Sequence, residues 1–174
     1  MKLEFVDIVD PDNNIISKTS KVEAHEKGLL HRCVIAEIIN SRGEWLLVIP
    51  KSHKQDSGQY VSPVGGHVSS GEQIEDALKR ETMEEVGIKT VSYKKIGEGI
   101  FNRNILGRHE NHYFILFEIY SDQEPILGDE GKEYKRFSKQ EIKEKMKSDP
   151  KMFGDAFHFV YKNIYREFAE NKHG

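Results

Sequence analysis

The stretch that decides the fold runs from Gly66 to Ile88 and reads GHVSSGEQIEDALKRETMEEVGI. Four apolar residues in it recur at helical spacing: Ile74, Ala77, Leu78 and Val86. Ser69 or Ser70 is a suitable N-cap, because Glu72 follows Ser69 at the distance that a capping box requires. Gly87 is the usual residue at the end of a helix. The stretch therefore predicts a glycine-rich loop followed by an amphipathic helix.

Three glutamates, Glu81, Glu84 and Glu85, lie on another face of this helix, with Arg80 beside them. Residues three and four apart are neighbours on a helix, so the carboxylates converge. At about 4 Å, each like-charge pair costs up to roughly 4 kcal/mol at an effective dielectric near 20. Mg²⁺ or Mn²⁺ would turn this repulsion into attraction. The alternative is a set of ordinary surface glutamates, which is the commoner case for such pairs.

The spacing resembles the Nudix box, G-x5-E-x7-R-E-U-x-E-E-x-G-U, in which U is aliphatic. The matching positions cover a stretch of 23 of the 174 residues: Gly66, Glu72, Arg80, Glu81, Glu84, Glu85, Gly87 and Ile88. Thr82 departs from the pattern at an aliphatic position, and we expect it to face the core. The resemblance implies an α+β fold, an α/β/α sandwich with a mixed sheet. It also implies metal-dependent hydrolysis of a nucleoside diphosphate linked to another group.

We expect Glu84 and Glu85 to be the principal ligands of Mg²⁺ or Mn²⁺. Glu81 is either a further ligand or the base that takes the proton of the attacking water. Arg80 is expected to orient a neighbouring glutamate, and Gly66 to supply a carbonyl or a close backbone approach. Glu72 is expected to steady the loop, either as a cap or through a salt bridge, and Glu130 is a weaker candidate for base or ligand.

A second resemblance, over residues 4–90, is to the Nudix proteins that are similar to isopentenyl-diphosphate isomerase. Its signs are the leading FVDIVDPDNN, the histidines of HEKGLLHR and the pair Gly66–His67. The isomerases bind a metal with three histidines and two glutamates. The corresponding residues imply a second metal site here: His25, His31, His67, Glu110 and His112. The alternative is that each histidine is a surface residue or a satisfied core residue.

The isomerase has its catalytic cysteine two residues before the histidine, and this chain has Gly65 there. Cys33 is the only thiol and does not occupy that position. Because the cysteine is missing and the glutamates of the box are intact, hydrolysis is favoured over isomerisation. Two alternatives stay open, an isomerase of isopentenyl diphosphate and a non-catalytic module that binds a diphosphate ligand.

The rest of the chain predicts strands around the central helix. Residues 1–28 read as a hairpin extension followed by a short helix, and a helix is expected at the C-terminal end, with Phe168 in its apolar stripe. Residues 97–108 read as a polar, glycine-punctuated loop. Four basic residues in loops are candidate phosphate contacts, with solvated loops as the alternative: Lys51, Lys54, Arg103 and Arg108.

Composition limits the class of protein. The length predicts one domain over residues 1–174, and the net charge of −3 gives no global attraction to nucleic acid. One cysteine allows no internal disulfide, and no apolar run approaches the roughly 18 residues of a membrane span. The N-terminus does not read as a signal peptide. We expect a cytoplasmic protein with a small-molecule diphosphate substrate. A homodimer is one state that the sequence allows.

Overall fold

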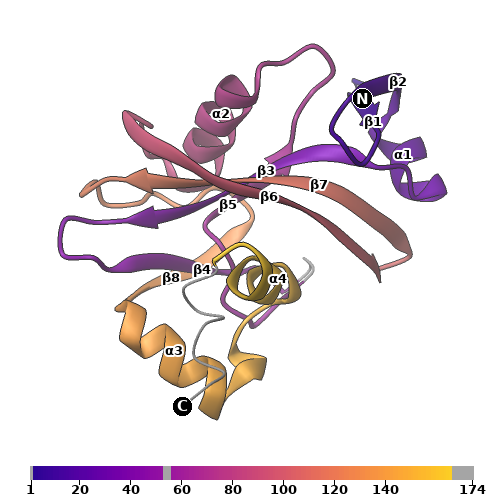
Figure 1. The fold of residues 1–174 in the computed structure, drawn as a ribbon. Helices are drawn as coiled ribbons and strands as arrows, with labels where there is room; N and C mark the ends of the chain where they lie inside the picture. Colours follow the sequence, from indigo (N-terminus) through magenta and orange to yellow (C-terminus); the bar gives the residue numbers. More distant parts are fainter. Residues whose placement is uncertain (1, 53–55, 166–174) are drawn as a thin grey trace.

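The computed structural model of the chain describes residues 2–52 and 56–165 (Figure 1). The strands are β1 (Phe5–Val9), β2 (Ile15–Ser20), β3 (His31–Ile39), β4 (Trp45–Pro50), β5 (Val64–His67), β6 (Ser92–Ile105), β7 (Arg108–Tyr120) and β8 (Gly131–Phe137). The helices are α1 (Lys21–Lys27), α2 (Ile74–Val86), α3 (Lys139–Ser148), the 3₁₀ turn η1 (Pro150–Met152) and α4 (Asp155–Asn163). Within these described ranges, no helix has the length and apolar character needed to cross a membrane.

Strand β3 is the centre of a mixed sheet. It pairs antiparallel with β1, β4 and β5, and parallel with β7. Strand β2 extends the sheet beyond β1, β8 extends it beyond β4, and β6 pairs with β7. Because β3 touches four other strands, its side chains lie beside residues from distant parts of the chain. This position makes β3 the strand on which the candidate site is built.

The side chains of β3 alternate between two cores. Val34, Ala36 and Ile38 pack on the face that α2 covers. Cys33 and Ile35 belong to the opposite core, which α3 and α4 complete. Figure 1 shows α2 on one side of the sheet and the two later helices on the other. A strand covered on both faces reads as a continuous apolar run. Since helices cover both faces of the sheet, the predicted α/β/α sandwich is confirmed.

The N-terminal extension also has the predicted form. A hairpin of β1 and β2 leads into α1, where the Ser20 hydroxyl accepts a hydrogen bond from the backbone N–H of Glu23. Gly28 ends the helix in the left-handed region, with φ of 64°. The extension packs against β3 and β7, so it is joined to the sheet that carries the rest of the fold.

The structure corrects two local predictions. Helix α2 begins at Ile74 with Gln73 as its N-cap, and no side chain caps it. The predicted helix start at Ser69 or Ser70 is therefore wrong. The Glu72 carboxylate instead lies in the loop before the helix, where it accepts hydrogen bonds from the backbone N–H of Ser69 and from Arg80. Residues 97–105 are not a loop but part of β6, since pairing with β7 fixes the backbone as far as Ile105. Two earlier predictions, for Lys54 and Phe168, lie outside the described residues.

Glu37 on β3 is a fully buried carboxyl group. One of its oxygens accepts a hydrogen bond from the Ser62 hydroxyl, and the other has no partner among the described residues. Burial raises the pKa of Glu37 from 4.5 to about 8. Between these values the folded state keeps a proton that the unfolded state loses. The free energy of unfolding therefore falls as the pH rises through this window.

We predict that Glu37→Gln removes this fall in the free energy of unfolding with rising pH. The variant should match the wild type near pH 4.5 and exceed its stability by on the order of 3 kcal/mol at pH 7. Urea unfolding curves measured at several pH values would test the prediction. Equal pH dependence of the two proteins would contradict it.

Candidate functional site

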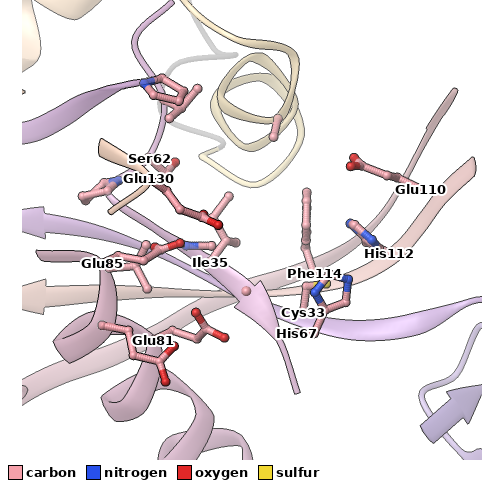
Figure 2. A pocket seen from close by; sticks show the side chains of 18 of the residues that line it. Cys33, Ile35, Ser62, His67, Glu81, Glu85, Glu110, His112, Phe114 and Glu130 are labelled. Atoms are coloured by element: carbon pink, nitrogen blue, oxygen red, sulfur yellow. The ribbon is translucent and has the colours of Figure 1, made fainter. Parts of the chain in front are cut away.

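A cavity of about 680 Å³ lies against the sheet and is lined by residues of β3, β5, α2, β6 and β7 and of the loop before β8. Figure 2 shows two groups of polar side chains at its two ends, with Cys33 and Phe114 between them. Glu81, Glu85 and Glu130 lie at one end. His112 and Glu110 lie at the other. The cavity therefore extends between the two groups of residues at which the sequence predicts metal sites.

The carboxylate end is built on the last turns of α2. The Glu81 side chain is 13 % exposed and that of Glu84 is 58 % exposed. One Glu85 oxygen accepts a hydrogen bond from the backbone N–H of Gly65 at 2.9 Å. Burial raises the pKa of the Glu85 carboxyl well above its usual range, and nearby carboxylates raise it further. Burial also raises the pKa of Glu81. Such a set of hard oxygen donors fits a divalent cation such as Mg²⁺ or Mn²⁺.

The guanidinium of Arg80 forms hydrogen bonds with several neighbouring groups of the protein. Its guanidinium donates to both oxygens of Glu72, at 2.8 and 3.0 Å, and to Glu81 at 2.8 Å. It also donates to the carbonyl of His67 at 3.0 Å and reaches Glu84 at 3.5 Å. These bonds place Arg80 between the loop on one side and the box glutamates on the other.

Gly66 leaves room for Glu81. A Cβ atom at Gly66 would lie 2.1 Å from the carboxyl carbon of Glu81, well inside any contact distance. At Gly65 the same atom would meet nothing within 4 Å. Glycine at position 66 therefore lets the Glu81 carboxylate pack directly against the backbone of β5. This is the close approach predicted from the sequence.

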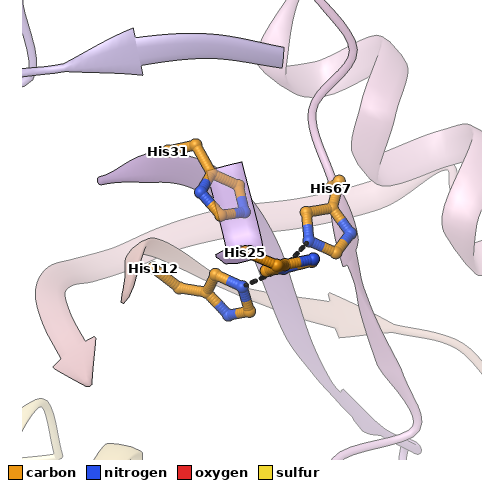
Figure 3. Close-up of side chains that lie close together, drawn as sticks. All are labelled: His25, His31, His67 and His112. Atoms are coloured by element: carbon orange, nitrogen blue, oxygen red, sulfur yellow. Dashed lines mark hydrogen bonds between the residues drawn. The ribbon is translucent and has the colours of Figure 1, made fainter. Parts of the chain in front are cut away.

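The other end of the cavity holds a cluster of histidines, drawn in Figure 3. The four residues come from α1, β3, β5 and β7, and their ligand atoms lie within 4.8 Å of one another: His25, His31, His67 and His112. The Nε2 atom of His25 is 3.3 Å from that of His112 and 3.2 Å from that of His67. The parallel register of β3 and β7 sets His31 beside His112.

The protonation of the cluster suits a metal site. The Nδ1 atom of His31 lies 2.7 Å from the carbonyl oxygen of Leu29 and donates to it, which leaves Nε2 as an acceptor. That Nε2 is buried without a hydrogen-bond partner among the described residues. Burial lowers the pKa of His25 to about 4, and lowers the pKa of His67 and His112 well below the usual value. Neutral imidazoles are the form that binds metals.

Contrary to the expectation from the sequence, Glu110 does not join the histidine cluster. Its carboxylate pairs with Arg103 at 2.8 Å and with Arg108 at 2.7 Å. Arg103 also pairs with Asp56 at 3.0 Å. Both arginines line the cavity, so the predicted phosphate contacts of Arg103 and Arg108 stay predictions, with carboxylates already paired to both. Lys51 is not among the cavity-lining residues of the described ranges, and Lys54 lies outside those ranges.

Sequence reasoning missed Lys21, which lines the cavity and pairs with Glu4. A signal was available, because Lys21 precedes His25 by four residues and therefore shares its face of α1. Glu130 was a weaker candidate and does line the carboxylate end, where its charge raises the pKa of Glu85. Lys21 and Glu130 therefore join the candidate site residues.

Known proteins are similar to this chain in sequence and fold. An uncharacterised Nudix hydrolase from Clostridium acetobutylicum is 33 % identical over 131 residues, which cover 72 % of this chain and 63 % of that protein. This chain thus spans less than two thirds of the length of that relative. An isopentenyl-diphosphate Delta-isomerase from Photorhabdus laumondii is 28 % identical over 174 residues, or 96 % of each chain.

The fold has a solved counterpart in a Deinococcus radiodurans protein with a TM-score of 0.72, 21 % identity, and coverage of 94 % of this chain and 100 % of that one. The sequence profile of the NUDIX domain matches residues 29–157, which hold the whole of the box and three of the four clustered histidines. With most of its length matched by this profile, the chain belongs to the Nudix family.

Proposed function

We propose that this chain is a metal-dependent hydrolase that splits the diphosphate linkage of a small molecule of the nucleoside-diphosphate type. The observation that carries the proposal is the environment of Glu85. Its carboxylate lines the cavity with those of Glu81, Glu84 and Glu130, and burial together with these three charges raises the pKa of Glu85. Carboxylates arranged in this way repel one another when no cation is bound, and their oxygens are well suited to binding one.

Each residue of the carboxylate end has a role in this proposal. Glu84 and Glu85 hold the cation, while Arg80 keeps Glu81 in place. Glu81 is a further ligand or accepts the proton of the attacking water, for which a raised pKa is favourable. A divalent cation bound there neutralises phosphate charge and acidifies water.

Hydrolysis is tested with a panel of diphosphates, each with Mg²⁺, with Mn²⁺ and with EDTA. The panel includes nucleotide sugars, dinucleoside polyphosphates, NADH, ADP-ribose, CoA, nucleoside diphosphates and prenyl diphosphates. Metal-dependent release of a phosphorylated product supports the proposal. Stabilisation by a ligand without any product would instead favour a module that only binds diphosphates.

Isomerisation of isopentenyl diphosphate is the second candidate, because the similarity to the Photorhabdus isomerase extends over nearly the whole of both chains. Gly65 supplies no thiol, and the buried Cys33 lies on the neighbouring strand, in register with His67. The reaction needs a proton donor and an acceptor on a carbon skeleton. An NMR assay for dimethylallyl diphosphate separates this activity from hydrolysis.

We further propose that the histidine cluster binds a transition metal. Its donors are four imidazoles without a carboxylate, a set that favours Zn²⁺, Co²⁺ or Ni²⁺ over Mg²⁺. The orphaned Nε2 of His31 would gain a partner in such a complex. The Nε2 atom of His25 lies 3.2 Å from that of His67 and 3.3 Å from that of His112, so one ion could bind all three.

We predict that the protein retains about one equivalent of Zn²⁺ after dialysis, and that the ion raises its melting temperature. His31→Ala should abolish retention, because it removes a ligand whose other nitrogen is already fixed by Leu29. His109→Ala is the control, since its ring bonds to Asn102 outside the cluster. Equal zinc content in both variants, measured by atomic absorption, would contradict the assignment.

A further inference from the structure

Asp7 on β1 is a buried acid outside the cavity, with 8 % of the residue exposed. One of its oxygens accepts a hydrogen bond from the Ser70 hydroxyl at 2.6 Å, and the other accepts one from the backbone N–H of Gly71 at 3.2 Å. Arg32 on β3 pairs with it at 3.3 Å. Both oxygens of Asp7 are therefore used to hold the loop that leads into the Nudix box helix.

Backbone contacts join the same two segments. The N–H of Ser70 donates to the carbonyl of Phe5 at 2.9 Å, and Val6 forms a bridge with Ser69. The N–H of Val68 donates to the carbonyl of Arg32 at 3.1 Å. Residues 68–71 are thus attached to the N-terminal hairpin on one side and to β3 on the other.

The loop is connected to the carboxylate end by a short series of contacts. The N–H of Ser69 donates to the Glu72 carboxylate at 2.9 Å. Glu72 accepts two hydrogen bonds from Arg80, whose remaining nitrogen donates to Glu81. Because no side chain caps α2, the placement of Glu72 depends on the loop rather than on the start of the helix.

We infer that Asp7 is a positioning residue for the proposed reaction. It fixes the loop of residues 69–72, so that Glu72 and Arg80 hold Glu81 in the orientation that binds the cation. Asp7 does not line the cavity, so it acts only through these residues. The inference rests on the proposed function for its catalytic consequence, although its effect on cation binding can be measured separately.

The charge of Asp7 is part of this role. Burial raises the pKa of Asp7, but the hydrogen bonds from Ser70 and Gly71 and the charge of Arg32 outweigh burial and leave the pKa below its usual value. Asp7 is therefore ionised at neutral pH. An asparagine has no charge and one acceptor oxygen in place of two. Arg32 would lose its ion-pair partner, and either the Ser70 hydroxyl or the Gly71 N–H would lose its acceptor.

The test is the affinity of Asp7→Asn for Mn²⁺, followed by electron paramagnetic resonance of the free ion. The carboxylate site is identified as the one that Glu85→Gln removes. We expect the dissociation constant of that site to rise about tenfold, the lower end of what outer partners of a metal site contribute. Hydrolysis should lose activity at low Mn²⁺ and recover most of it at saturating Mn²⁺.

Asp12→Asn is the matched control, because it makes the same charge change in the turn of the same hairpin and should leave the affinity unchanged. Ser70→Ala provides a milder second variant, with an expected rise of about two- to threefold. If Asp7→Asn and Ser70→Ala only lower the melting temperature and bind Mn²⁺ as tightly as wild type, Asp7 is merely structural and the inference fails. Failure of the wild type to hydrolyse any diphosphate would overturn the proposed function alone, since Mn²⁺ binding needs no turnover.

Discussion

Glu85→Gln lowers the turnover of diphosphate hydrolysis at least ~10²-fold while the chain stays folded. The amide oxygen can still accept the hydrogen bond from the N–H of Gly65, so the side chain keeps its place. The negative charge that attracts the cation is lost. Replacing a carboxylate whose pKa is raised by burial and by like charges also removes repulsion, and the melting temperature should not fall. Glu84→Gln should have a similar effect on turnover.

The control for this prediction lies on the same helix. Glu75→Gln makes the identical change at an exposed position in the first turn of α2, away from the cavity, and should retain full activity. Rates are measured at saturating Mg²⁺, with EDTA as the reference for complete loss. Near-normal hydrolysis by both the Glu84 and the Glu85 variants would exclude the carboxylate assignment.

Local patterns predicted the parts of the fold that are determined by neighbouring residues. The helical period of residues 74–86 places Ala77, Leu78 and Val86 in the core and the box glutamates on the cavity side. Thr82, the one departure from the box, is fully buried as expected and donates to the carbonyl of Leu78. These outcomes depend on spacing within one helix, which a sequence displays directly.

Local sequence patterns could not predict the contacts between residues that lie far apart in the chain. Residues 97–105 look like a loop by composition, and only pairing with β7 makes them a strand. Arg103 looks like a free cation until the fold brings Asp56 and Glu110 to it. The histidine cluster draws on four separate elements, and only the resemblance to a known family connected its members. Spacing alone would not have brought His25 and His112 together, since 87 residues separate them.

Gly66→Ala is expected to cost at least about tenfold in turnover and in Mn²⁺ affinity, with little change in stability. Its backbone does not lie in the left-handed region, so alanine strains nothing locally. The added methyl group would overlap the Glu81 carboxyl group, which is at the end of a flexible side chain and must move aside. Displacing one carboxylate by about 1 Å is enough to cost up to 10²-fold in rate.

Gly65→Ala is the matched control for this change, because it adds the same methyl group one residue earlier, where nothing lies within 4 Å. Adjacent residues of a strand point to opposite faces, so only the alanine at position 66 faces α2. Mn²⁺ titrations of both variants separate loss of the Glu81 position from a general effect of stiffening β5. If Gly66→Ala binds Mn²⁺ and turns over like the wild type, Glu81 acts neither as ligand nor as base, and the chemistry must rest on Glu84, Glu85 and Glu130.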